Sequence, residues 1–178
     1  MNRAQLELVV SEVARRFDLD YFYVVGSAAV LAWIPDATAG VLTATRDVDV
    51  IPQPVEPERM SRVMDQIDFV LGEASDFDVE HGVYAQAVDD TTVAYAPVGW
   101  KDRAIPLRVG RKTALCMDLH DLMLSKYGAG REKDLLFNRA LAGTGTVFPR
   151  TLVERLQDVR CDDRLRELIR ARIAADFT

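Results

Sequence analysis

YFYVVGS at residues 21–27 and TRDVDV at residues 45–50 are the two stretches that decide the fold. The first is aromatic and β-branched, which predicts a short strand buried on both faces that ends at Gly26. The second predicts another strand. Since residues i and i+2 of a strand share a face, Asp47 and Asp49 project side by side, about 7 Å apart along the backbone.

Two aspartates in a valine-rich strand need a physical reason, because Asp is depleted in strands. Taken alone, they lie on a solvated face or pair with Arg46. The upstream Gly26 and Ser27, at a strand-to-helix junction, favour a binding site instead. Gly26 lets the backbone approach a phosphate closely, and Ser27 can cap the next helix while its hydroxyl meets a phosphate oxygen. The paired carboxylates are hard oxygen ligands that suit Mg²⁺.

The remaining pattern predicts helices and strands in an α+β arrangement. An amphipathic helix with Asn2 as its cap precedes the first strand, and another begins at Pro57. Residues 81–88, 91–98 and 103–109 have the β-branched composition of strands, and the tail from Asp118 onward has helical periodicity in three or four pieces. We therefore divide the chain into a core at residues 1–115 and a helical C-terminal region at residues 116–178.

Composition and charge narrow the functional class. The 178 residues carry a formal net charge of −6, which argues against tight non-specific binding to a nucleic-acid backbone. Cys116 and Cys161 lack the spacing of metal ligands. The first seventeen residues alternate charged and apolar side chains, which predicts neither a signal peptide nor a membrane span. We expect a globular, cytoplasmic protein.

Lys126 is the third candidate for chemistry. Leu119, Leu122 and Met123 form an apolar helical stripe, and Lys126 continues it, which places an ammonium group at the edge of a buried face. The alternative is an ordinary lysine whose stem covers apolar surface. Asp134, eight residues on, either orients a lysine or forms a solvated salt bridge.

These segments resemble the DNA polymerase β-like nucleotidyltransferase superfamily, in which an apolar residue, Gly and Gly or Ser precede a strand with two alternating acids. The closer resemblance is to bacterial nucleotidyltransferase-like proteins related to abortive-infection toxins. The turn from Pro97 to Arg103 looks like an uncharacterised branch of that group. The matching segments are Gly26-Ser27-Ala28-Ala29, Thr45-Arg46-Asp47-Val48-Asp49, Lys126 and Arg131-Glu132-Lys133-Asp134.

The resemblance implies a nucleotidyltransferase-like mixed sheet flanked by helices. It also implies Mg²⁺-dependent transfer of a nucleoside monophosphate from an NTP to an acceptor hydroxyl, in a toxin–antitoxin-like setting. The implied catalytic residues are Asp47, Asp49 and Lys126, of which the two aspartates hold the metal. The implied nucleotide-binding residues are Gly26, Ser27, Arg46, Lys126 and Lys133.

A third acid is expected from the resemblance, on a later strand, where it would help to hold metal and deprotonate the acceptor. The central polar residue of the 81–88 segment is Gln86, which can do neither. Asp78 and Asp89 are the leading candidates for the missing acid. Either one of them fills the role, or the chain works with two carboxylates, or it has lost activity.

Two classes of function therefore stay open. The first is the nucleotidyltransferase, whose acceptor is a tRNA end, a protein hydroxyl or a small molecule. The second is a catalytically silent module of the same fold that binds a nucleotide or a protein. We expect a nucleotide ligand and no membrane, with either a partner protein or a homo-oligomer as the assembly.

Overall fold

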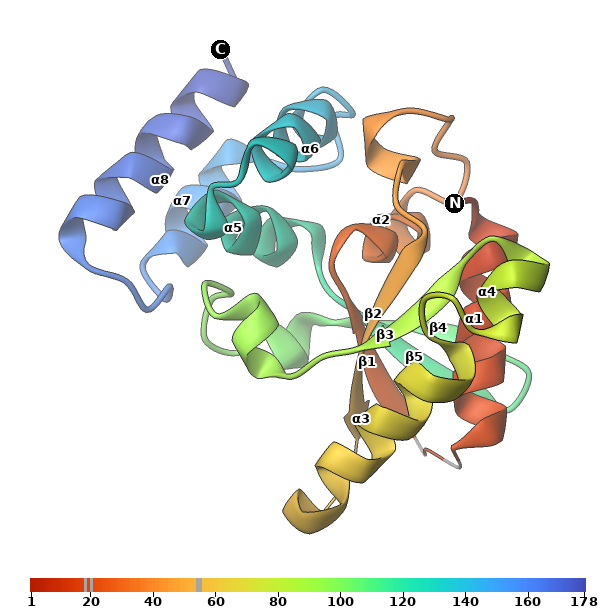
Figure 1. Ribbon diagram of the computed structural model, residues 1–178. Coiled ribbons are helices and arrows are strands. Elements are labelled where there is room, and N and C mark those ends of the chain that lie inside the picture. The colour runs from red at the N-terminus through yellow and green to blue at the C-terminus, as the bar shows by residue number, and fades with distance from the viewer. Residues whose placement is uncertain (18, 20, 54–55) are drawn as a thin grey trace.

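The computed structural model describes residues 1–17, 19, 21–53 and 56–178. At its centre is a five-stranded mixed sheet in the order β3-β2-β1-β5-β4 (Figure 1). The strands are β1 (Tyr21–Val25), β2 (Asp47–Gln53), β3 (Tyr84–Ala87), β4 (Ile105–Val109) and β5 (Lys112–Cys116). The expected α+β class, with helices flanking the sheet and a helical C-terminal region, is confirmed.

The strands formed by the YFYVVGS and TRDVDV stretches lie next to each other in the sheet. β1 pairs with β2 in antiparallel fashion, and Val25 lies opposite Asp49. Its other neighbour is β5, which runs parallel to it. Four of the five β1 residues are buried, as the apolar sequence predicts for a strand covered on both faces.

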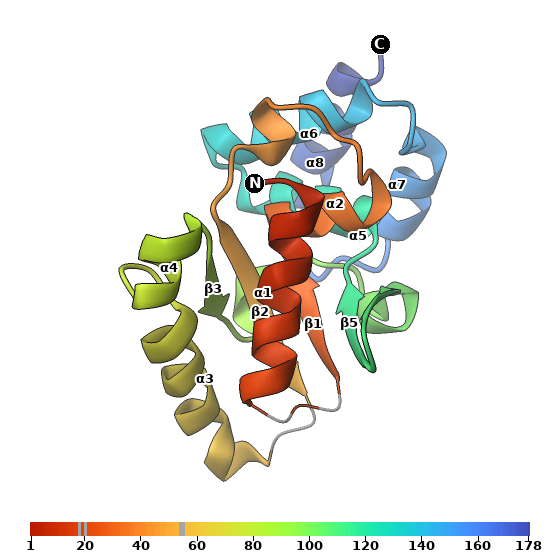
Figure 2. The same ribbon diagram turned by 90° about the vertical axis from the view of Figure 1, so that its right-hand side faces the viewer.

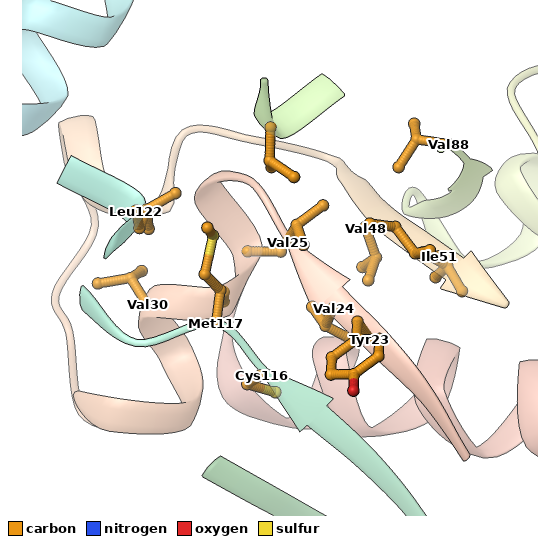
Figure 3. Packing of buried hydrophobic residues seen from close by; sticks show 14 of the residues in the cluster. Tyr23, Val24, Val25, Val30, Val48, Ile51, Val88, Cys116, Met117 and Leu122 are labelled. Atoms are coloured by element: carbon orange, nitrogen blue, oxygen red, sulfur yellow. The ribbon is translucent and has the colours of Figure 1, made fainter. Parts of the chain in front are cut away.

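Helices α1 (Arg3–Arg16) and α3 (Pro57–Leu71) pack against the strands, and α4 (Asp76–His81) follows α3 (Figure 2). The predicted Asn2 cap is present, because its side chain accepts a hydrogen bond from the Gln5 backbone N–H. A 3₁₀ turn and the short helix α2 (Val30–Trp33) leave β1 at Gly26. Buried side chains of β1, β2 and β5 pack together in the core, among them Val24, Val48 and Cys116 (Figure 3).

One predicted strand is wrong and one was missed. Residues 91–98 form no strand; the segment begins in a 3₁₀ turn, Asp90–Val93, because the Asp89 carboxylate accepts hydrogen bonds from the Thr91 N–H and hydroxyl. Such local side-chain bonds compete with a β ladder. Helix α4 (Asp76–His81) takes up His81, the first residue of the predicted 81–88 strand. The missed strand, β5, occupies an inner position in the sheet.

The C-terminal region contains four helices: α5 (Leu119–Ala129), α6 (Glu132–Ala142), α7 (Pro149–Leu156) and α8 (Asp163–Asp176). They gather beside one end of the sheet (Figure 1). The boundary after residue 115 stays a prediction. Across the described ranges, no helix combines the length and apolar character needed to cross a membrane.

A buried charge network joins α5 to its surroundings. Asp121 is fully buried and accepts hydrogen bonds from Arg103 Nε at 2.7 Å and from an Arg155 terminal nitrogen at 2.9 Å. The same Arg155 nitrogen bonds Asp118 at 2.6 Å. Burial raises the pKa of Asp118, but the hydrogen bond from His120 and the charge of Arg155 outweigh it and hold that pKa at about 2. The network therefore fixes the start of α5 against α7 and the 100–103 turn.

Candidate active site

A pocket of about 650 Å³ lies where β1, β2 and β3 face helices α5 and α6. This volume is within the range of small-molecule sites in proteins. The pocket brings together six of the residues that the sequence predicts for the site: Gly26, Ser27, Asp47, Asp49, Lys126 and Lys133. Residues more than a hundred positions apart in the sequence thus share one cavity.

The aspartates occupy alternate positions of β2, as predicted. Val48 and Val50 are fully buried, whereas Asp47 and Asp49 are half-buried and line the pocket. The Thr45 hydroxyl donates a hydrogen bond to Asp47 and holds that carboxylate in place. Thr45 also lines the pocket; it was part of the matching motif but was not among the predicted site residues.

Gly26 is required by both its backbone conformation and its surroundings. Its φ angle of +66° lies in the left-handed region that favours glycine. A Cβ atom at this position would lie 2.0 Å from Asp49 Oδ2. Only glycine therefore allows the end of β1 to lie against the Asp49 carboxylate.

Asp49 is electrostatically strained. Burial raises the pKa of its carboxyl to about 6, and repulsion from Asp47 adds to that effect. The positive charges of Lys126, Lys133 and Arg131 oppose the rise without cancelling it. A site that holds two neighbouring carboxylates in partial burial gains from a bound cation, which removes their repulsion.

Lys126 lies at the centre of the pocket's positive side. Its Nζ donates to Ser27 Oγ at 3.0 Å and to Asp134 Oδ1 at 3.1 Å, and it lies 4.4 Å from the centroid of the Phe137 ring. Only about a tenth of its side chain is exposed. Burial lowers the pKa of Lys126, and the Asp134 carboxylate opposes that effect. Lys126 therefore links helix α5 to the Gly-Ser turn, so it is more than a surface lysine.

Asp134 is a fully buried carboxylate that forms ion pairs with two basic side chains. Besides Lys126, it accepts hydrogen bonds from Arg131 Nε at 2.6 Å and from a terminal nitrogen of Arg131 at 3.3 Å. Burial raises its pKa, but these hydrogen bonds and charges outweigh burial, so the pKa falls below its ordinary value. Of the two readings that the sequence left open for Asp134, orientation of a lysine agrees with this geometry. Arg131 lines the pocket as well and was not among the predicted binding residues.

Arg46, Asp78 and Asp89 lie outside the pocket lining. Arg46 forms an ion pair with the buried Asp78 of α4 and donates to the Gly82 carbonyl at 3.0 Å. The carboxylate that pairs with Arg46 is therefore Asp78, and not Asp47 as one interpretation of the sequence expected. Asp89 is an exposed residue that caps a 3₁₀ turn. Neither candidate for the third acid lines the pocket with the aspartate pair, and in the described part of the chain neither forms a cluster of three metal ligands with it.

Gln86 takes the position next to Asp49. β2 and β3 run parallel, and Asp49 is in register with Gln86, while Asp47 is in register with Tyr84. Both β3 side chains line the pocket. The site thus presents a neutral amide beside its carboxylate pair.

The donor set fits Mg²⁺ bound together with a substrate. Within residues 1–17, 19, 21–53 and 56–178, no cluster of three or more Asp, Glu, His or Cys side chains could hold a metal ion by itself. Mg²⁺ is commonly held by one or two carboxylates together with waters and substrate phosphates. Asp47 and Asp49 supply two such carboxylates, and the missing Cβ of Gly26 leaves room beside them.

Comparison with known proteins agrees with this geometry. A family model described as a nucleotidyltransferase of unknown function (DUF6036) matches residues 4–143. No curated protein and no solved structure matches the chain. The matched range contains the whole sheet, all of α1 except its first residue, helices α2 to α6 and every pocket residue discussed above. Since it also covers well over half of the chain, the protein belongs to this nucleotidyltransferase family.

Proposed function

We propose that the protein transfers a nucleoside monophosphate from an Mg²⁺-bound NTP to an oxygen nucleophile of a second substrate, with release of pyrophosphate. The observation that carries the proposal is the contact between Gly26 and Asp49. It places a backbone turn without a side chain directly against a carboxylate, inside a pocket that also holds a buried lysine.

The triphosphate is assigned to the positive side of the pocket. Lys126, Arg131 and Lys133 all belong to the α5–α6 corner and line the cavity. Ser27 Oγ already bonds Lys126 and is placed to share a phosphate oxygen with it. Phosphoryl transfer depends mainly on positioning and charge neutralisation, and these three basic side chains can supply both.

Asp47 and Asp49 would hold Mg²⁺. The metal, when bound, supplies charge neutralisation at the phosphates and lowers the pKa of a coordinated hydroxyl. The chain's own contribution is to keep the two carboxylates side by side on β2, with Thr45 bonded to Asp47 and Gly26 packed against Asp49. Lys126, bonded to both Ser27 and Asp134, is held ready to balance the charge of the leaving group.

Gln86 supports a second candidate function, a catalytically silent module that binds a nucleotide. Its amide lies in register with Asp49, where a carboxylate would serve as a third ligand and base. In this alternative the pocket binds Mg²⁺ and an NTP but transfers nothing.

Label transfer separates these two functions. The protein is incubated with each α-labelled NTP, Mg²⁺ and a cell extract that supplies acceptors, and labelled species are identified. We expect transfer by the wild-type chain and its loss in Gly26→Ala, because the new Cβ displaces Asp49.

Gly110→Ala is the matched control. Its φ of +62° imposes a similar backbone cost, but nothing lies within 4 Å of the added Cβ. Gly110→Ala should transfer label like the wild type. Nucleotide binding without any labelled product would support the silent module, and equal transfer by the two alanine variants would refute the assigned site.

A further inference from the structure

Three neutral polar side chains, Tyr84, Gln86 and Thr92, line the pocket on the side of β3. Gln86 and Thr92 are exposed and Tyr84 is half-buried. Throughout the described part of the chain, no hydrogen-bond partner is present for the Tyr84 hydroxyl, the Gln86 amide or the Thr92 hydroxyl. We call these three residues the β3 wall.

The chemistry of the β3 wall matches hydroxyl groups. A phenol, an amide and an aliphatic hydroxyl each donate and accept hydrogen bonds, as sugar hydroxyls do. Val88 and Val93 line the pocket beside them and offer apolar contact for the C–H groups of a sugar ring.

The charge distribution separates this wall from the phosphate side. Asp47 is in register with Tyr84, and Asp49 with Gln86, so carboxylates lie directly beside the β3 wall. Without a bound cation these carboxylates would repel an anionic group placed at the β3 wall itself, whereas a neutral sugar hydroxyl meets no such repulsion. The lining cations Lys126, Arg131 and Lys133 come from the α5–α6 corner, where a triphosphate belongs.

We propose that the β3 wall is the acceptor subsite, and that the acceptor is a sugar presenting neighbouring hydroxyl groups. This inference rests on the proposed nucleotidyl transfer and narrows its second substrate. One sugar hydroxyl oxygen forms a bond to the α-phosphorus, and the bond from that phosphorus to the oxygen bridging to the β-phosphate breaks. Pyrophosphate leaves with the electron pair, and the hydroxyl proton passes to solvent.

Two defined probes carry the same sugar chemistry from different sources. The first is a short RNA oligomer with a free ribose at its 3′ end, compared with the same oligomer ending in 2′,3′-dideoxyribose. The second is a panel of neutral mono- and disaccharides. With α-labelled NTP and Mg²⁺, we expect label on a diol-bearing probe and none on the dideoxy oligomer. Label on the oligomer identifies a polymer end as the source, and label on a saccharide identifies a small molecule.

Variants of the β3 wall test whether it binds the acceptor, both in turnover and in a binding measurement. Gln86→Leu and Tyr84→Phe remove hydrogen-bonding groups and largely keep side-chain size. We expect each to raise the acceptor KM about tenfold. Each should also weaken probe binding by a similar factor when α,β-methylene ATP, which cannot be cleaved at the reacting bond, fills the nucleotide site. Gln66→Leu, on an exposed α3 position outside the pocket, is the matched control and should change neither quantity.

The acceptor proposal and the nucleotidyl-transfer proposal fail in different ways. Label on a protein hydroxyl, or on no diol-bearing probe while Mg²⁺ and NTP still bind, overturns the acceptor class. An unchanged acceptor KM in both wall variants overturns the subsite. Absence of Mg²⁺-dependent NTP binding overturns the proposed function itself, and with it this inference.

Discussion

Gly26 and Asp49 lie against each other in the proposed site, with no room for a side chain between them. Asp49 carries a raised pKa because its carboxyl is partly buried and lies near Asp47, and Gly26 provides the space in which that carboxyl sits. If this position served folding alone, a neutral residue in place of Asp49 would give a more stable chain. Keeping Asp49 ionised is instead useful for binding a cation.

The pH dependence of stability follows from Asp49. Its pKa of about 6 in the folded chain exceeds the ordinary value of 3.8, so between roughly pH 4 and 6 the folded chain retains a proton that the unfolded chain has lost. Raising the pH through this window therefore lowers the free energy of unfolding, by on the order of 2–3 kcal/mol for this group.

Asp49→Asn removes that cost. We expect the metal-free variant to exceed the wild type in unfolding free energy at pH 7.5 and to approach it below pH 4, as measured by urea denaturation. Added Mg²⁺ and NTP should stabilise only the wild type. A variant less stable than the wild type at pH 7.5 would show that the carboxylate is not strained.

At the scale of elements, the sequence predicted correctly those helices and strands whose formation depends on a short stretch of neighbouring residues. The β1 and β2 strands, the capped first helix and the alternation of valine and aspartate were all visible in short stretches. Strand β5 was not predicted, because its sequence KTALC is short and of mixed polarity. Its inner position in the sheet depends on pairing with β1, some ninety residues earlier. Residues 91–98 were wrongly predicted to form a strand, because the hydrogen bond that the Asp89 side chain accepts from the Thr91 N–H stabilises a turn there.

The site shows the same division. Gly26, Ser27, Asp47, Asp49, Lys126 and Lys133 were selected from motifs, and all six line the pocket. Arg46 was selected with them, but its partner Asp78 lies thirty-two residues away, and no motif revealed that pairing. Tyr84 and Thr92 carry no signal in the sequence, because Tyr84 reaches the pocket through the register of β3 beside β2 and Thr92 through the 3₁₀ turn that follows β3.

The α5–α6 corner yields a prediction at this scale. Asp134 lies on α6 and binds Lys126 of α5, so Asp134→Asn should leave that lysine poorly positioned. We expect the Kd for Mg²⁺-bound NTP to rise about tenfold, which corresponds to about 1.4 kcal/mol. Glu132→Gln changes an exposed acid two residues away and should leave the Kd unaltered. Equal effects from the two substitutions would point to long-range charge rather than to lysine positioning.

At the scale of the molecule, the helical region and the sheet build the pocket together. The buried Asp121 receives Arg155 from α7 and Arg103 from the turn after residue 99, so it fixes the helix that carries Lys126. Removing one partner of a buried charge network leaves the others unpaired in a dry interior.

Asp121→Asn should therefore destabilise the whole fold, by about 3–5 kcal/mol in chemical denaturation. Arg150→Ala, which breaks an exposed pair with Glu154, should cost less than about 1 kcal/mol. If Asp121→Asn proves as mild as this control, the network does not hold α5 in place.

The Asp47–Asp49 pair and Lys126 are proposed to form a single site for an NTP and Mg²⁺. Thermal unfolding of the wild type and of Asp47→Asn, with NTP in the presence and absence of Mg²⁺, tests it directly. We predict that NTP at about 100 times its Kd stabilises the wild type by about 2.7 kcal/mol, only with Mg²⁺, and that the variant gains nothing. Equal stabilisation without Mg²⁺, or in Asp47→Asn, would contradict the claim.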